Sequence, residues 1–143
     1  MPKFLIEYIC KSEQETADVA YNFAKNIEAG TVVALVGELG SGKTFFAKQL
    51  AQALGFDGYV SSPTFTILNI YKAKIPIYHF DFYRLNDLEE IENIGFYDLI
   101  QADGIFLIEW PEKARTLFPT LYYQIRFDIL SENVRKINIE IIK

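Results

Sequence analysis

A glycine-rich segment in the first third of the chain limits the folds that this sequence can adopt. It reads Gly37-Glu38-Leu39-Gly40-Ser41-Gly42-Lys43-Thr44 and fits the pattern G-x-x-x-x-G-K-[ST] without a mismatch. The apolar, β-branched run Thr31–Val36 precedes it and predicts a buried strand, and Lys43–Leu54 follows it with apolar residues at helical spacing. A strand, a glycine-rich loop and a helix in this order are typical of a phosphate-binding loop in an α/β protein.

Each part of this segment suits an anion. Glycine lets the backbone approach phosphate oxygens closely, so that successive N–H groups point into the loop. The helix that begins near Lys43 directs the positive end of its dipole at the same place. Lys43 supplies a compact charge for the outer phosphates, and the Thr44 hydroxyl can ligate Mg²⁺. The segment therefore predicts a binding site for a nucleoside triphosphate.

Two acidic residues at strand ends are candidates for the rest of this site. Proteins with such a loop hold the metal through an acid at the end of an apolar strand. The apolar run Ile105–Ile108 is followed directly by Glu109, and the run Ile75–Asp81 ends in Asp81. Glu109 is the first candidate and Asp81 is the second. A strand-end carboxylate that merely faces water is the alternative interpretation for either residue.

A third candidate lies in the segment Ser61-Ser62-Pro63-Thr64, between the predicted helix and the next predicted strand. A segment that responds to the terminal phosphate would be placed there. Pro63 restricts the local backbone, and the Thr64 hydroxyl could contact the γ-phosphate, the metal or the attacking water. An ordinary turn before a strand fits the same spacing.

The rest of the chain predicts strands and helices around this unit. Ser12 and Glu15 form a capping box, which predicts the start of a helix that Gly30 would end. Strands alternate with helices early and follow one another late. We therefore expect one domain over residues 1–143 with a three-layer α/β, P-loop NTPase-like fold and a mixed, mostly parallel central sheet. The other predicted elements are strands at Phe4–Ile9, Phe65–Tyr71, Ile75–Asp81, Ile105–Ile108, Tyr122–Ile129 and Val134–Ile142, and a helix at Asn86–Asn93. The last two strands are expected to form an antiparallel pair with Ser131-Glu132-Asn133 in the turn.

Composition argues against several classes of protein. The 14 Lys and Arg residues against 19 Asp and Glu give a formal net charge of −5, so a basic nucleic-acid-binding face is not the default expectation. The single cysteine excludes an internal disulfide framework. The apolar stretches are shorter than the roughly 18 residues of a membrane span, and the apolar run near the N-terminus is too short for a signal peptide. We expect a cytoplasmic protein that does not associate with membranes.

Missing sequence features narrow the nucleotide and the reaction. The chain has no Asn-Lys-x-Asp segment, the guanine-reading pattern of G proteins, so ATP is favoured over GTP. It has only four arginines and no insertion long enough for the arginine-bearing lid of a small-molecule kinase. An activating cation supplied by a partner protein would fit this composition.

His79 and Trp110 are the only residues of their types in the chain. His79 shares a predicted strand with Asp81, and a structural, hydrogen-bonding role is favoured for it over a catalytic one. Trp110 follows Glu109, so its side chain points away from that of Glu109 if the strand continues. Core packing and a contact with the nucleotide or a partner are the two interpretations of Trp110, and neither is favoured.

Four short motifs occur in a fixed order along the chain. They are Gly37–Thr44, Ser62-Pro63-Thr64-Phe65-Thr66, His79-Phe80-Asp81-Phe82-Tyr83-Arg84-Leu85 and Ile108-Glu109-Trp110-Pro111. In this order they resemble the TsaE family (formerly YjeE), and the helix start Ser12-Glu13-Gln14-Glu15-Thr16 is similar as well. The resemblance covers about Ser12 to Ala114. Glu38 and Ser41 stand where the family more often has Asp and Ala, and neither exchange removes a backbone N–H donor.

The resemblance implies a Mg²⁺-dependent ATPase needed to make N6-threonylcarbamoyladenosine in tRNA. It implies that the protein acts with a TsaB–TsaD pair, that ATP hydrolysis supports turnover of that pair, and that the partners make most of the contact with tRNA. Asp81 and Thr64 would order the attacking water, and Glu15 and Thr16 would approach the nucleoside. The implied ATP-binding residues are Glu15, Thr16, Gly37, Glu38, Leu39, Gly40, Ser41, Gly42, Lys43, Thr44 and Trp110, the implied catalytic residues are Lys43, Thr64, Asp81 and Glu109, and the implied Mg²⁺ ligands are Thr44 and Glu109.

Two other functions use the same phosphate-binding loop. One is a small-molecule P-loop kinase, which the few arginines and the missing lid disfavour. The other is a regulatory binding module that signals by its nucleotide-dependent conformation, with hydrolysis incidental. A local basic strip that includes Lys72 and Lys74 is the one feature that would favour direct contact with tRNA.

Overall fold

Seven strands of the chain form one sheet in the computed structural model, which describes residues 2–58 and 67–143. The strand order is β1-β7-β6-β2-β5-β4-β3. The elements along the chain are β1 (Pro2–Cys10), α1 (Glu13–Ala24), β2 (Val32–Val36), α2 (Lys43–Ala53), β3 (Leu68–Tyr71), β4 (Ile77–Asp81), α3 (Leu88–Asn93), α4 (Phe96–Leu99), β5 (Ile105–Glu109), the 3-10 helix η2 (Glu112–Leu117), β6 (Tyr122–Ser131) and β7 (Val134–Ile142).

The sheet is mixed and mostly parallel, as the sequence predicts. β4, β5, β2 and β6 pair in parallel as neighbours. β7 runs antiparallel to β6, and β1 runs antiparallel to β7, so β1 has the same direction as the central four strands. β3 is antiparallel to β4 at the other edge. Five strands therefore share one direction and two oppose it.

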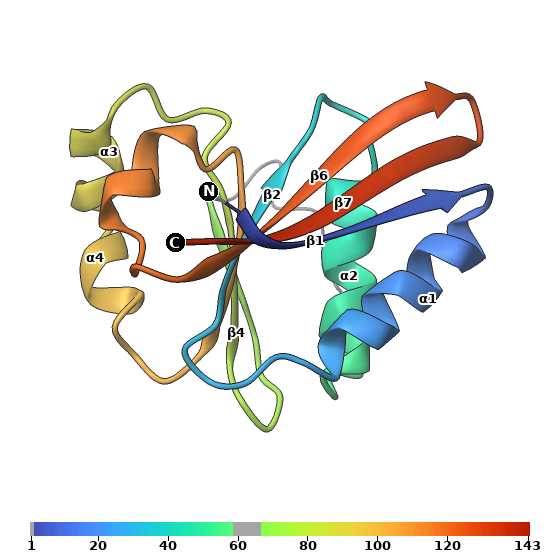
Figure 1. The fold of residues 1–143 in the computed structure, drawn as a ribbon. Helices are drawn as coiled ribbons and strands as arrows, with labels where there is room; N and C mark the ends of the chain where they lie inside the picture. Colours follow the sequence, from blue (N-terminus) through green and yellow to red (C-terminus); the bar gives the residue numbers. More distant parts are fainter. Residues whose placement is uncertain (1, 59–66) are drawn as a thin grey trace.

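Helices cover both faces of the sheet, which gives three layers (Figure 1). α1 and α2 pack on one face, and α3, α4 and η2 pack on the other. β5 lies between the two layers and is buried at every position, with Ile105 and Leu107 in one core and Phe106 and Ile108 in the other. This double burial explains why its sequence is a continuous apolar run rather than an alternating one.

The first helix begins where the sequence predicts and ends earlier. The Ser12 hydroxyl accepts a hydrogen bond from the Glu15 N–H at 3.1 Å, and the Glu15 carboxylate accepts one from the Lys11 N–H at 2.9 Å. The helix ends at Ala24, because the N–H groups of the next residues turn to carbonyls three positions back. Gly30 does not end this helix, and it adopts a positive φ of 94° in the connection to β2.

Other boundaries differ from the predicted ones for local reasons. β4 begins at Ile77 rather than at Ile75, and Pro76, which has no N–H for a strand ladder, lies just before it. β3 is described from Leu68, so the start of the predicted strand Phe65–Tyr71 lies outside the described residues. The sequence did not predict α4 or η2, because each is too short to show a helical period.

Phe96 allows a test of the core beneath α3 and α4. Its side chain is fully buried and packs edge-on against Phe80 and Phe82, with ring centroids 5.0 and 5.3 Å away. We expect Phe96→Ala to lower the free energy of unfolding by about 3–5 kcal/mol, measured by urea denaturation. Tyr97→Ala, at the exposed neighbouring position, should change it by less than about 0.5 kcal/mol. Equal losses in the two variants would contradict this description of the core.

Candidate functional site

The carboxyl ends of three neighbouring parallel strands lie beside the start of α2. In the sheet register, Asp81 of β4 is opposite Glu109 of β5, and Glu109 is opposite Leu35 of β2. Open α/β sheets bind ligands at this edge. A cavity of about 1070 Å³ opens there. Its lining comes from the glycine-rich loop, the ends of β4 and β5, the start of α1 and the turn between β6 and β7.

The glycine-rich loop needs a residue without a side chain at its first position. A Cβ atom at Gly37 would lie 2.6 Å from the Ser41 hydroxyl oxygen and 2.8 Å from the Phe127 carbonyl oxygen. Both contacts are shorter than van der Waals packing allows, and the second is with backbone. Glycine at position 37 therefore lets the loop that leads from β2 to α2 pass close to the backbone of β6.

Lys43 is the first residue of α2, and its side chain folds back over the loop. The ammonium group donates a hydrogen bond to the Gly37 carbonyl and lies 3.7 Å from the centroid of the Trp110 ring. Burial lowers the pKa of Lys43, while the nearby carboxylates of Glu109 and Asp81 act in the opposite direction. The cation is thus held at the loop by a carbonyl and an aromatic face.

Trp110 lies in the cavity lining because β5 ends at Glu109. It has a φ of 56°, which makes it the one non-glycine residue with positive φ in the described ranges 2–58 and 67–143. The sequence predicted that the Trp110 side chain would point away from that of Glu109 if the strand continued. Because the strand ends at Glu109, this condition is not met. The exposed ring of Tyr83 packs against the indole, with centroids 4.9 Å apart.

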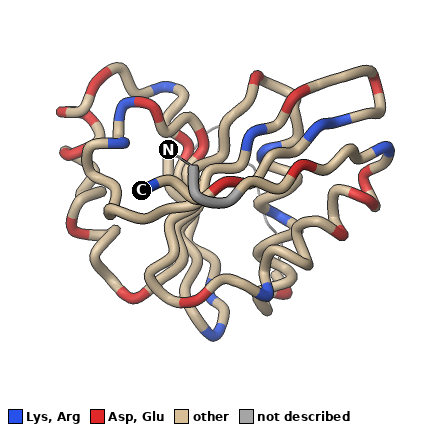
Figure 2. The backbone as a smooth tube through the Cα atoms, viewed as in Figure 1, with Lys and Arg blue, Asp and Glu red and all other residues tan. Residues whose placement is uncertain are grey.

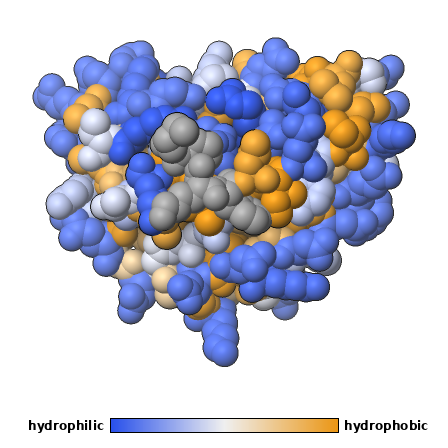
Figure 3. Space-filling view, viewed as in Figure 1, coloured by the Kyte–Doolittle hydropathy of each residue, from blue (hydrophilic) through white to orange (hydrophobic). Residues whose placement is uncertain are grey.

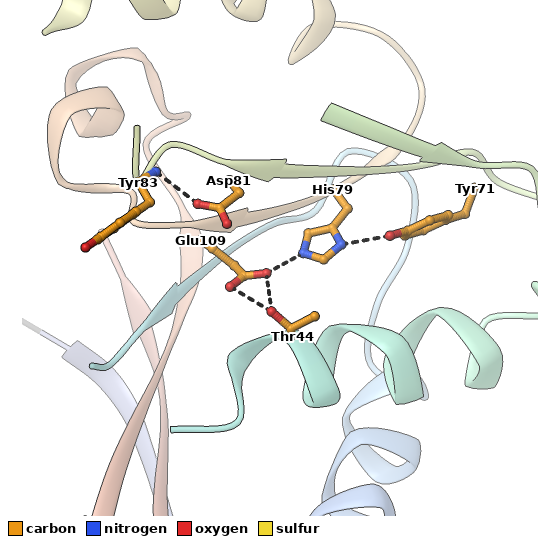
Figure 4. Close-up of polar contacts among 6 residues, drawn as sticks. All are labelled: Thr44, Tyr71, His79, Asp81, Tyr83 and Glu109. Carbon is orange, nitrogen blue, oxygen red and sulfur yellow. Dashed lines mark hydrogen bonds and ion pairs between the residues drawn. The ribbon is translucent and has the colours of Figure 1, made fainter. Parts of the chain in front are cut away.

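Glu109 is a buried carboxylate held from two sides (Figure 4). The Thr44 hydroxyl lies 3.2 Å from its Oε1 and 3.1 Å from its Oε2. The His79 Nε2 lies 2.7 Å from Oε2, and the Tyr71 hydroxyl lies 3.0 Å from His79 Nδ1. The hydrogen-bonding role expected for His79 is therefore confirmed, and its partner is the predicted metal-binding acid.

Asp81 borders the same cavity from the adjacent strand. Its Oδ1 accepts a hydrogen bond from the Tyr83 N–H at 2.9 Å, which fixes the carboxylate (Figure 4). Burial raises the pKa of Asp81, against the lowering effect of that hydrogen bond. Asp81 and Glu109 thus present two carboxylates with different surroundings to one cavity.

The other residues expected at the site divide into three groups. Leu39, Gly40, Ser41, Gly42 and Thr16 line the cavity with Lys43 and Thr44. Gly37 and Glu38 belong to the loop but are not in the described lining, and the Glu15 carboxylate is bonded at the start of α1 instead. Thr64 lies outside the described residues.

Sequence reasoning missed the contribution of the last strands to the cavity. The turn between β6 and β7 supplies Glu132 and Asn133, and Arg135 follows at the start of β7. The sequence predicts this turn but does not show that it lies at the cavity, because that location depends on the parallel pairing of β6 with β2, which is distant in the sequence. The predicted pairing of the last two strands is confirmed.

The family of the chain follows from a comparison with known proteins. Residues 10–137 match the family described as "Threonylcarbamoyl adenosine biosynthesis protein TsaE". The chain belongs to the TsaE family. A relative from Treponema pallidum, named "tRNA threonylcarbamoyladenosine biosynthesis protein TsaE", is 36% identical over 131 residues, which cover 92% of this chain and 97% of the relative.

Another TsaE protein and a solved structure agree with this assignment. The TsaE protein of Haemophilus influenzae is 45% identical over 93 residues, which cover 64% of this chain and 59% of the relative. The crystal structure of YdiB from Bacillus subtilis superposes with a TM-score of 0.78 and 28% identity, covering 100% of this chain and 88% of that one. TsaE membership places this chain among nucleotide-binding proteins of tRNA threonylcarbamoyladenosine biosynthesis.

The raised pKa of Asp81 predicts that this residue costs stability at neutral pH. Folding favours its protonated form, so the contribution of Asp81 to stability falls as the pH rises from about 4, the ordinary Asp value, through the raised one. Asp81→Asn keeps an oxygen for the Tyr83 N–H. We expect this variant to need more urea than the wild type to unfold at pH 7, and the difference to shrink near pH 4. Asp103→Asn, in an exposed turn, should change neither midpoint, and a destabilised Asp81→Asn at pH 7 would refute the prediction.

The close packing at Gly37 predicts a local defect in Gly37→Ala. The added methyl group forces the loop away from Phe127, so we expect nucleotide affinity to fall at least about tenfold, while the far-ultraviolet circular dichroism stays that of the wild type. Fluorescence of the only tryptophan, Trp110, can report the binding. The matched control is Gly95→Ala, which also has positive φ but has no atom within 4 Å of the new Cβ. Unchanged affinity in Gly37→Ala would contradict the proposed fit of the loop.

Proposed function

We propose that this TsaE protein binds ATP and Mg²⁺ at the loop Gly37–Thr44, hydrolyses ATP slowly alone, and does so faster with TsaB- and TsaD-like partners in the cytoplasm. The observation that carries the proposal is the contact of the Thr44 hydroxyl with the buried Glu109 carboxylate, beside the Lys43 ammonium. These groups are the ones that a metal-bound triphosphate requires. The curated names of the relatives supply the pathway, which is tRNA threonylcarbamoyladenosine biosynthesis.

The loop and the start of α2 supply donors for the phosphates. The first N–H groups of a helix have no partner within it, and the helix dipole favours an anion there. The Ser41 hydroxyl is buried and has no hydrogen-bond partner among the described residues, so it is a further donor. Lys43 would exchange the Gly37 carbonyl and the Trp110 ring for phosphate oxygens.

Thr44 and Glu109 fit a magnesium ion. Hydroxyl and carboxylate oxygens are the hard ligands that Mg²⁺ prefers, and this ion commonly takes only one or two protein groups beside phosphates and waters. The two side chains already meet at the end of β5 and the start of α2. When bound there, Mg²⁺ would neutralise part of the charge on the terminal phosphates.

Asp81 is the proposed proton acceptor for the attacking water. Its raised pKa makes it a better base than an ordinary aspartate, and the Tyr83 N–H holds it at the cavity. In the proposed reaction, the water oxygen bonds to the γ-phosphorus, the bond from that phosphorus to the β–γ bridging oxygen breaks, and a water proton passes to Asp81. Thr64 is proposed to orient the same water.

An apolar surface beside the cavity supports a partner-dependent reaction. Ile9, Ile129 and Leu130 are exposed at the ends of β1 and β6, and Figure 3 shows hydrophobic atoms gathered at this upper right corner. The turn that follows β6 contributes Glu132 and Asn133 to the cavity lining. A partner that covers these apolar residues would lie beside the nucleotide, where it could supply a cation to the reaction.

The charge distribution supports tRNA contact through the partners rather than through this chain alone. The net charge is −5, and Figure 2 shows basic residues interspersed with acidic ones along the backbone. Lys72 and Lys74 lie in the turn after β3, which is at the edge of the sheet. Two lysines neutralise few phosphates, so they would give weak and salt-sensitive binding.

Hydrolysis of ATP and GTP by the purified protein, alone and with a TsaB–TsaD pair, tests this function. We expect slow Mg²⁺-dependent ATP turnover that the pair accelerates, little GTP turnover, and at least about a 100-fold loss in Lys43→Ala. Lys25→Ala, at the far end of α1, is the matched control and should behave as wild type.

Three other results would redirect the assignment. Fast turnover that ignores the pair would remove the partner from the proposal while leaving the ATP site. ADP formation that depends strictly on an acceptor metabolite would identify a small-molecule kinase. A regulatory binding module would be supported if Glu109→Gln kept partner binding and left tRNA modification working.

A further inference from the structure

A chain of buried hydrogen bonds lies behind the carboxylate of Glu109. It runs from the Tyr71 hydroxyl to His79 Nδ1 over 3.0 Å, and from His79 Nε2 to Glu109 Oε2 over 2.7 Å (Figure 4). Tyr71 is 4% exposed, His79 is 0% exposed and Glu109 is 2% exposed. The three residues come from β3, β4 and β5, so the chain crosses the sheet toward α2 and Thr44.

The chemistry of the groups gives the chain a direction. A carboxylate can only accept, so the short contact at Glu109 requires a proton on His79 Nε2. In the tautomer that carries its proton on Nε2, Nδ1 is an acceptor, and the Tyr71 hydroxyl is its donor. Burial raises the pKa of Tyr71 to about 12, so the phenol keeps its proton. Each donor therefore points toward Glu109.

The two oxygens of Glu109 have different surroundings as a result. Oε2 has two partners, His79 Nε2 and the Thr44 hydroxyl. Oε1 has one partner among the described residues, which is the same Thr44 hydroxyl. Oε1 is consequently the oxygen with free acceptor capacity on the side of α2. A carboxylate with one oxygen already bonded offers the other as a single ligand in a fixed direction.

We propose that Tyr71 and His79 are positioning residues for the metal ligand Glu109, which they orient by holding Oε2 so that Oε1 is left for the bound cation. This inference rests on the proposed function, because it assumes that Glu109 is a Mg²⁺ ligand. His79 acts through Glu109, and Tyr71 acts through His79. Neither residue contacts the nucleotide in this scheme.

Packing alone does not account for this arrangement. Burying a hydroxyl, an imidazole and a carboxylate costs free energy unless every group is bonded, and apolar side chains could fill the same volume without that cost. The Tyr71 ring also packs on Phe56, with centroids 5.0 Å apart, and Tyr71→Phe would keep this contact. The hydroxyl can therefore be removed while the packing stays.

Substitutions at His79 separate its two hydrogen bonds. Asn places a polar atom near the position of Nδ1 but does not reach Glu109, whereas Gln reaches toward the position of Nε2 and can still donate. The quantity to measure is the Mg²⁺ concentration that gives half of the Mg²⁺-dependent increase in ADP affinity. We expect this concentration to rise about 10–100-fold in His79→Asn and less than about threefold in His79→Gln. ADP binding in EDTA should be the same in both variants as in the wild type.

Tyr71→Phe should raise the same Mg²⁺ requirement about two- to tenfold, because His79 loses the donor that fixes its ring. Tyr78→Phe is the matched control, since Tyr78 precedes His79 on β4 and stacks on Phe106 in the opposite core, with centroids 5.1 Å apart. Trp110 fluorescence reports ADP binding in every variant. An unchanged Mg²⁺ requirement in both His79→Asn and Tyr71→Phe would overturn the inference.

A spectroscopic measurement tests the hydrogen bonds without metal or nucleotide. His79 is the only histidine, so nitrogen NMR of histidine-labelled protein gives a single pair of ring signals. We expect the tautomer protonated on Nε2 in the wild type, and loss of that fixed state in Tyr71→Phe. A proton on Nδ1 in the wild type would overturn the inference. Wild-type protein that binds ADP without any Mg²⁺ dependence would overturn both the inference and the proposed Mg²⁺ site, whereas normal Mg²⁺ dependence with insensitive His79 variants would overturn the inference alone.

Discussion

The parallel pairing of β5 with both β2 and β4 is the constraint on which the site depends. Because parallel strands end at the same edge of a sheet, this pairing brings Glu109 and Asp81 to the edge where the glycine-rich loop leaves β2. The short loop then returns the chain into α2, which places Thr44 against Glu109 although 65 positions separate them. The apolar run of β5 provides the driving force, since it is buried between two helical layers.

Local chemistry allowed much of this arrangement to be predicted from the sequence. The loop carries its own signal in its glycines, Lys43 and Thr44, and a continuous apolar run marks a doubly covered strand such as β5. Glu109 follows such a run directly and Asp81 ends the predicted strand Ile75–Asp81, so both could be placed at strand ends. Their common edge is shown by the parallel register of β4 and β5 and agrees with the mostly parallel sheet that the sequence predicts.

Features that depend on long-range packing could not be predicted in the same way. The orientation of Trp110 depends on a single positive φ after β5, which no residue pattern announces for a tryptophan. Tyr71 meets His79 because β3 folds back on β4, and the turn at Glu132 lies at the cavity because β6 runs parallel to β2 and extends beyond its carboxyl end. The helices α4 and η2 are too short for a periodic signal and depend on the core beneath them.

The contact of Lys43 with Gly37 and Trp110 also affects how tightly an anion is held. The ammonium group that is proposed to meet a phosphate also contacts a carbonyl and an indole of the same chain. A phosphate would have to displace these two contacts of Lys43. Its apparent affinity would then be reduced in proportion to the fraction of molecules in which the Lys43 ammonium is available. At the proposed ATP site, this competition would favour exchange of the ligand over permanent retention.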